Sequence, residues 1–148
     1  MTADKKGIQV EFITPQGNQV CLEAKSVQVR TSLGNTEILL NHAPFFALLE
    51  PGVIRITPVE NYKQSEFIYI NDSGIVEVYK NRVVILADNG FFGQDLDEKA
   101  LAQSESELRR KMNTSPERLA KTLKQLNEVK EKLRIVEEIR GNAKQTKH

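Results

Sequence analysis

The residue types that most often carry catalysis or bind metals are few in this chain, and they lie far apart. Among its 148 residues there are one cysteine, Cys21, and two histidines, His42 and His148. A protein zinc site usually takes about four ligands, mostly Cys and His side chains at short spacings. We interpret Cys21 as a small apolar strand residue. One cysteine permits no internal disulfide, which is typical of a reducing compartment. The sequence therefore predicts no metal site.

Acidic residues stand close together in two places, at Asp95, Asp97 and Glu98 and again at Glu137 and Glu138. Nothing in the sequence sets a general acid against a general base there, so we interpret both groups as helix-capping and surface charges. The chain also lacks a phosphate-binding loop, a dinucleotide-binding fingerprint and a nucleophile elbow. These observations predict no catalytic residue and a protein that is not an enzyme by itself.

The spacing of apolar residues changes near Gly93. Before this point they alternate in short runs broken by Gly and Pro, and seven of the eight glycines lie at or before Gly93. After it they recur every three or four residues, and Pro is absent until Pro116. A period of two indicates strands, and a period of about 3.6 indicates helix. We therefore expect an all-β sandwich or barrel at residues 1–93, followed by a C-terminal antiparallel two-helix hairpin at 94–141.

The first part reads as many short strands at nearly regular spacing, which is typical of a sandwich or barrel. Ile8, Val10 and Phe12 show the alternation most clearly. The Gly-, Pro- and Asn-rich segments between the runs predict turns. They fall at residues 15–18, 34–35, 41–44, 50–52, 71–74 and 80–81.

The second part reads as two amphipathic helices. Asp95 or Asp97 can cap the start of the first helix. Thr114 and Glu117 have the spacing of a capping box at the start of the second. Gly141 is expected to end that helix, leaving residues 142–148 as a flexible tail. A short connection between the helices makes them antiparallel.

The charge balance argues neither for nor against nucleic acid, because 21 basic residues face 20 acidic ones. The polar N-terminus lacks the pattern of a signal or transit peptide. No run approaches the roughly 20 apolar residues of a membrane-spanning helix. We expect no nucleic-acid partner, and contact with a membrane only through a protein partner.

Taken in order, several segments resemble the epsilon subunit family of bacterial F-type ATP synthases. The resemblance covers roughly residues 7–141, and it rests on the order and spacing of its segments more than on any single motif. These segments are Gly34 to Pro44, Glu50 to Ile56, Glu66 to Tyr69, Ser73 to Val78, Val83 to Asp88, Gly93 to Glu98 and Leu133 to Glu137.

The resemblance implies a non-catalytic subunit of the rotating central stalk. In that family the β domain binds the gamma subunit and the ring of c subunits, and it helps couple proton flow to ATP synthesis. The helical arm can fold on the β domain, or extend to the alpha and beta subunits and inhibit ATP hydrolysis. The resemblance also implies a peripheral location on the cytoplasmic face of the bacterial inner membrane.

The resemblance assigns the c-ring contact to Asn35, Glu37 and His42. Two departures bear on this turn. Glu37 stands where the family usually has Gly, and Leu40 stands where it usually has Pro. A loop residue that fixes its own turn is the alternative interpretation of His42.

Some members of the family carry a nucleotide-binding motif of Ile or Leu, then Asp, two residues, Arg and Ala. Here Leu96 and Asp97 match its start, but Ala100 stands at the arginine position. Without the guanidinium the site lacks a strong bidentate phosphate contact. We therefore expect weak or absent ATP binding, and no cofactor.

The resemblance also assigns a docking role to basic residues of the second helix. Arg118, Lys121, Lys124 and Arg134 would then bind acidic segments of the catalytic beta subunits. The alternative is a solvated helix face with pairs such as Glu128–Lys132. Two other functions stay open at this point: an adaptor or chaperone-like protein that presents a coiled-coil hairpin, and a nucleotide sensor.

Overall fold

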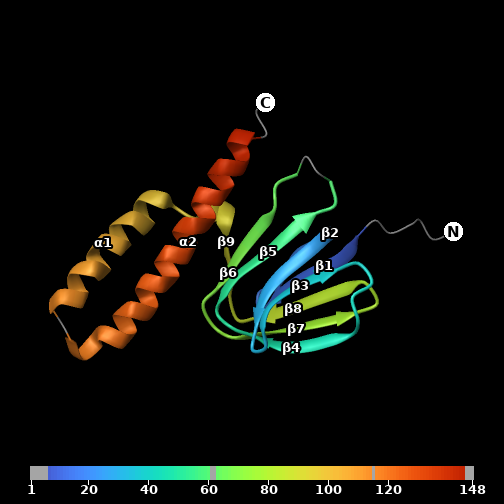
Figure 1. The fold of residues 1–148 in the computed structure, drawn as a ribbon, viewed down its shortest axis with the longest axis horizontal. Helices are drawn as coiled ribbons and strands as arrows, with labels where there is room; N and C mark the ends of the chain where they lie inside the picture. The colour runs from blue at the N-terminus through green and yellow to red at the C-terminus, as the bar shows by residue number, and fades with distance from the viewer. Residues whose placement is uncertain (1–6, 61–62, 115, 146–148) are drawn as a thin grey trace. The chain divides into compact units, whose positions relative to one another are not determined.

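The computed structural model describes residues 7–60, 63–114 and 116–145, with side chains described up to residue 141 (Figure 1). The chain divides into two compact units, Met1–Phe92 and Gly93–His148. The first is built from strands and the second from helices. The predicted class, a β-sandwich followed by two packed helices, is confirmed.

Nine strands form the described part of the first unit, and β2 is the longest of them at 15 residues. It pairs with β1 through its first half and with β3 and β5 through its second half. The strands are β1 (Ile8–Thr14), β2 (Gly17–Thr31), β3 (Gly34–Leu39), β4 (Phe45–Leu49), β5 (Gly52–Pro58), β6 (Glu66–Ile70), β7 (Gly74–Tyr79), β8 (Arg82–Ala87) and β9 (Phe91–Phe92).

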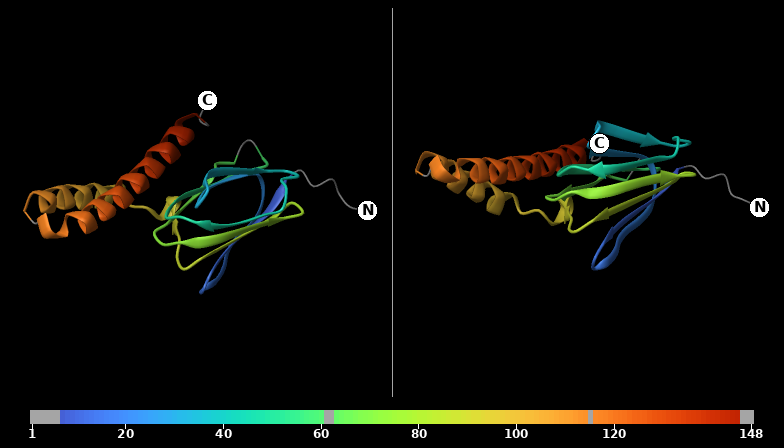
Figure 2. Two further views of the ribbon diagram at one scale, coloured as in Figure 1. Left: turned by 60° about the horizontal axis from the view of Figure 1, so that its bottom comes forward. Right: turned by 90° about the horizontal axis from the view of Figure 1, so that it is seen from below.

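The strands are arranged as two layers joined by β2. One layer has the order β1-β8-β7-β4, and the other has β3-β2-β5-β6-β9. All pairings are antiparallel except that of β1 with β8. The register of β2 shifts between Ala24 and Ser26, which marks a bulge where the strand leaves one layer for the other. Figure 2 shows the strands curving around the interior of this unit.

The core lies between the two layers, and alternation along the strands builds it. In β1 the buried side chains Ile8, Val10 and Phe12 alternate with half-buried ones. Each apolar side chain withdrawn from water contributes roughly 1.5–3 kcal/mol. The buried cluster consists of Ile8, Val10, Phe12, Ala24, Val27, Val29, Ile38, Ala47, Leu49, Ile54, Ile56, Ile68, Ile70, Val76, Val78, Val83, Ile85 and Ala87.

The second unit contains two α-helices, α1 (Glu98–Thr114) and α2 (Leu119–Gln145). Two short 3-10 turns, η1 (Gly93–Asp95) and η2 (Pro116–Arg118), precede them. The helices pack through Leu108 on α1 and Leu126 and Val129 on α2. Leu101, Met112 and Leu133 extend this small cluster.

Two predictions about the helix ends are wrong. Helix α2 continues through Gly141 to Gln145, so Gly141 does not end it. Gly141 lacks the positive φ of a helix-ending glycine, and the following Ala, Lys and Gln favour helix. The hydroxyl of Thr114 does not cap α2. It donates to the carbonyl oxygens of Arg110 and Lys111 at 3.3 and 3.4 Å, at the end of α1.

The predicted tail at 142–148 overlaps this helix, and its last residues, 146–148, lie outside the described part. Among the described residues, no helix is both long and apolar enough to cross a membrane.

Neighbouring positions of β8 test the assignment of the core. Ile85 is fully buried, whereas Leu86 on the opposite face is 44% exposed. We predict that Ile85→Ala lowers the free energy of unfolding by about 3 kcal/mol, because it leaves a cavity. The matched change Leu86→Ala should cost less than about 1 kcal/mol. Urea unfolding followed by circular dichroism measures both values, and equal losses would contradict the assigned faces.

Candidate functional site

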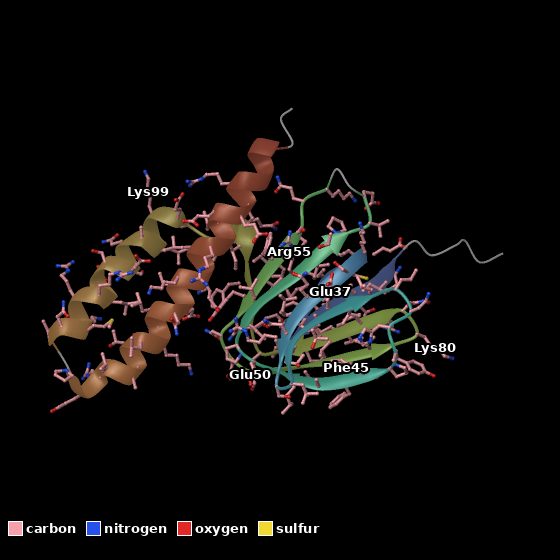
Figure 3. All side chains as sticks on the ribbon, viewed as in Figure 1. Glu37, Phe45, Glu50, Arg55, Lys80 and Lys99 are labelled. Atoms are coloured by element: carbon pink, nitrogen blue, oxygen red, sulfur yellow. The ribbon has the colours of Figure 1, made fainter. Side chains whose placement is uncertain are left out.

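The predicted c-ring residues Asn35 and Glu37 lie on the outer face of β3. Both are exposed, and so is Leu39. Ile38, which lies between Glu37 and Leu39, points into the core. Within the described part of the chain β3 pairs only with β2, so it forms an edge of its layer. A charged residue in the middle of an edge strand discourages unwanted strand pairing, and Glu37 provides one. Figure 3 labels Glu37 on this strand.

His42 lies in the turn after β3 and is half-buried. Its backbone N–H donates to the carbonyl of Leu39 at 3.2 Å. Its ring nitrogen Nδ1 lies 2.7 Å from the carbonyl oxygen of Ala43, and it must be the donor because a carbonyl can only accept. The ring also meets Phe45 edge-to-face, with centroids 5.9 Å apart. His42 therefore helps fix its own turn, and its contact with the c-ring stays a prediction.

A pair of asparagines that the sequence interpretation missed ties this turn to the β7–β8 turn. The Asn41 N–H donates to Oδ1 of Asn81 at 2.6 Å, and Nδ2 of Asn81 donates back to Oδ1 of Asn41 at 3.2 Å. Lys80, Asn81 and Asn41 all have positive φ. Asn tolerates this left-handed conformation better than most residues. The dipeptide Lys80–Asn81 signalled a turn, but the cross-loop bonds depend on the fold.

The structure does not bring all three predicted c-ring residues to one place. Asn35 stands near the start of β3 and His42 follows its end, with Glu37 between them. At about 3.3 Å per residue, the strand separates Asn35 from Leu39 by roughly 13 Å. A partner that contacts all three must therefore run along the strand rather than meet one point.

Leu96 and Asp97, the residues that match the nucleotide motif, lie just before α1. Oδ1 of Asp97 accepts hydrogen bonds from the N–H groups of Lys99 and Ala100 at 3.0 and 3.3 Å. This is the predicted N-cap, and it engages one oxygen of the carboxylate. Leu96 is half-buried, and Ala100 is exposed. Asp97 thus caps α1 without any nucleotide.

An ion pair joins the two ends of the helical unit. Arg140, near the end of α2, pairs with Glu98 in the first turn of α1. Glu105–Arg109 and Glu128–Lys132 are i,i+4 pairs within a helix, at 3.4 and 3.5 Å. The last of these was predicted. The Arg140–Glu98 pair bridges the two helices at the end away from their connection.

The predicted docking cations are exposed. Arg118 lies in η2, Lys121 and Lys124 lie in the first turns of α2, and Arg134 follows roughly 15 Å along the helix from Lys124. In the described part of the chain none of these four makes a salt bridge, unlike the pairs above. Leu119 and Leu123 beside them are 40% and 42% exposed. The start of α2 therefore presents apolar and cationic side chains together.

Across residues 7–60, 63–114 and 116–145, no three His, Cys, Asp or Glu side chains lie where they could share a metal ion. Comparison with known proteins shows which kind of protein carries the residues described above.

The sequence profile of the family described as "ATP synthase, Delta/Epsilon chain, beta-sandwich domain" matches residues 7–92, which is more than half of the chain. The chain belongs to this family. The matched region coincides with the strands of the first unit.

Two known proteins extend the comparison beyond the sandwich. The ATP synthase epsilon chain of Halorhodospira halophila is 27% identical over 139 residues, covering 93% of this chain and 97% of that protein. A chain in the structure of the Euglena gracilis mitochondrial ATP synthase (OSCP/F1/c-ring, rotational state 1) superposes with a TM-score of 0.62 at 16% identity. That match covers 97% of this chain and 84% of the other, and it supports the fold. Both matches extend beyond the sandwich into the helical unit.

Two substitutions of Asn81 separate the contribution of its side-chain hydrogen bonds to stability from that of its left-handed backbone conformation. We predict that Asn81→Gly costs about 1 kcal/mol of unfolding free energy, because the left-handed φ stays accessible and only the side-chain bonds are lost. Asn81→Ala should cost roughly 1 kcal/mol more, because Cβ disfavours that φ. Urea unfolding gives both values, and NMR of the His42 ring reports whether its turn moves. Equal costs would show that the conformation contributes nothing.

The interpretation of Asp97 predicts the outcome of nucleotide titration. Calorimetry of the whole chain with ATP should show no tight, stoichiometric binding, because Ala100 supplies no cation. Ala100→Arg restores the guanidinium at an exposed position and should raise the affinity for ATP. Tight binding by the unaltered chain would refute the prediction, and Lys99→Arg serves as a control that adds no charge.

Proposed function

We propose that this chain is the epsilon subunit of an F-type ATP synthase, a non-catalytic part of the central stalk. The observation that carries the proposal is the match to the epsilon chain over nearly the full length of both proteins. It includes the helices as well as the sandwich that defines the family. An adaptor of another kind would not be expected to share both parts in the same order.

In this proposal the sandwich anchors the subunit to gamma and to the c-ring. It turns with them and helps couple proton flow to ATP synthesis. Asn35, Glu37 and His42 provide the c-ring contact, and the exposed row along β3 supports a contact of extended shape. The complex then lies at the cytoplasmic face of a bacterial inner membrane, and this subunit reaches the membrane only through its partners.

The helical unit is proposed to be a regulatory arm. Four exposed cations of η2 and α2, none of which makes a salt bridge within the described residues, support docking to acidic segments of the alpha and beta subunits, together with the exposed Leu119 and Leu123. Such docking would hinder the movements that ATP hydrolysis requires, and so inhibit it. The Asp97 cap and Ala100 support regulation without a bound nucleotide.

The decisive experiment compares the whole chain with one that ends at Gly93, each added to an enzyme that lacks this subunit. Because the sandwich has its own core and keeps β9, we expect the shortened chain to fold and to co-purify with gamma and the c-ring. ATP hydrolysis should be several-fold faster with the shortened chain, because the arm is gone. Failure of the whole chain to bind gamma would refute the stalk assignment.

The arm is tested separately in the whole chain. Lys121→Glu combined with Lys124→Glu should raise hydrolysis, while binding to gamma stays unchanged. Lys99→Glu, a charge reversal at an exposed lysine of α1, is the control. Equal hydrolysis by all three proteins would remove the docking role and leave the stalk assignment intact.

A further inference from the structure

A small cavity lies in the first unit, between the β1–β2 hairpin and the segment that joins β8 to β9. Its volume is about 190 Å³. Since a water molecule takes up about 30 Å³ in the liquid, the cavity has room for roughly six non-hydrogen atoms. The side chains that give it its chemistry are Thr14, Gln16 and Gln19 on the hairpin and Asp88, Asn89 and Phe92 opposite.

The side chain of Asn89 has an unused acceptor at this cavity. Its Oδ1 is buried, and within the described residues no group donates a hydrogen bond to it. The large majority of buried polar groups in proteins have a partner, so this oxygen calls for a donor. The terminal torsion of an Asn side chain is broad, and a small rotation turns Oδ1 toward a donor that enters the cavity.

Asp88 gives the cavity its charge. No other charged side chain is among the described residues that line the cavity. The residue is exposed, and no salt bridge within the described part of the chain engages it. An ionised carboxylate can only accept hydrogen bonds, and it accepts them most strongly from a cation. Asp88 and Asn89 therefore favour a cationic donor.

The hairpin uses its own donors internally. The hydroxyl of Thr14 donates to Oε1 of Gln16 at 3.0 Å. Nε2 of Gln19 donates to that hydroxyl oxygen and to the carbonyl of Gly17, both at 3.4 Å. The amide oxygen of Gln19 is then the group of this side chain that can meet a ligand, and it is an acceptor. The hairpin side therefore suits a donor rather than an anion.

One wall of the cavity is aromatic. Phe92 is half-buried, and its ring meets the fully buried ring of Phe12 edge-to-face, with centroids 6.1 Å apart. This contact fixes the ring of Phe92 beside the acceptors. A phenyl ring covers methylene groups, and it also attracts a cation. The wall therefore favours a cation that carries an alkyl chain over a bare metal ion.

We propose that this cavity binds a primary alkylammonium ion, a small aliphatic amine in its charged form. The –NH3+ group donates to Asp88 and to Oδ1 of Asn89, and the methylene chain lies against Phe92. A primary ammonium has three donors, which leaves one for the amide oxygen of Gln19. The inference goes beyond the proposed function and does not rest on it, because the ligand is a small cation rather than a subunit of the enzyme.

The test is a titration of the whole chain with n-butylammonium at constant ionic strength. NMR follows the backbone amides of residues 88–90 and the side-chain amide of Asn89. We expect saturable shifts at these groups with a midpoint of about 1 mM or lower. Tetramethylammonium has the same charge and the same number of non-hydrogen atoms but no N–H. It should bind at least about tenfold more weakly, because it cannot donate to the acceptors.

Variants of the acceptors locate the site. Asp88→Asn should weaken n-butylammonium binding about fivefold or more, and Asn89→Ala should weaken it several-fold. Glu77→Gln is the control, because it removes an exposed negative charge elsewhere on the sandwich. Glu77 pairs with Val84, which precedes Asp88 by roughly 13 Å along β8. The control should bind as the unaltered chain does, and circular dichroism checks that every variant is folded.

Three results would each overturn the inference. They are the absence of saturable shifts, equal binding of the two ammonium ions, and binding by Asp88→Asn within about twofold of the Glu77→Gln control. None of them bears on gamma binding, which tests the proposed function separately.

Discussion

The pairing of strand β2 is the constraint on which the sandwich depends. Its 15 residues pair with β1 in one layer and with β3 and β5 in the other, and Thr31 at its end meets Leu49 of β4. A slip of one residue would turn every side chain of β2 to the opposite face. Such a slip would expose Val27 and Val29 and disrupt both layers at once. The bulge after Ala24 lets one strand serve both layers without that loss.

The proposed c-ring surface and the proposed cavity site follow from this arrangement. Because β2 continues into β3 through a tight turn, β3 becomes an edge and presents Asn35 and Glu37 outward. Because β2 begins at the β1–β2 hairpin, Gln16 and Gln19 of that hairpin line a small cavity together with Asp88. The β1–β2 hairpin and the start of β3 thus adjoin opposite ends of β2.

Alternation and turn residues predicted the fold class, and the cap at Asp97 followed from its position before an apolar helix. The row of paired apolar residues Leu48, Ile75, Leu86 and Ile13 on the outer face of one layer could not be predicted in the same way. Its four residues come from four strands, and the parallel pairing of β1 with β8 brings Ile13 beside Leu86. The asparagine pair likewise depends on two turns that are 40 residues apart. Gly141 misled the prediction because a glycine ends a helix only where the backbone turns left-handed, and here it does not.

The helical unit has little apolar packing of its own, and this bears on its proposed role. Leu108, Leu126 and Val129 form its small buried cluster, whereas Leu119 and Leu123 stay exposed beside Lys121 and Lys124. Most helix stability in proteins comes from packing of an apolar face rather than from propensity. A surface that covers the two leucines and pairs the cations would therefore bind one state of the arm better than another. Differential affinity of this kind is what shifts a population between states, so the proposed regulation would act through burial and charge at the start of α2 rather than through a bound nucleotide.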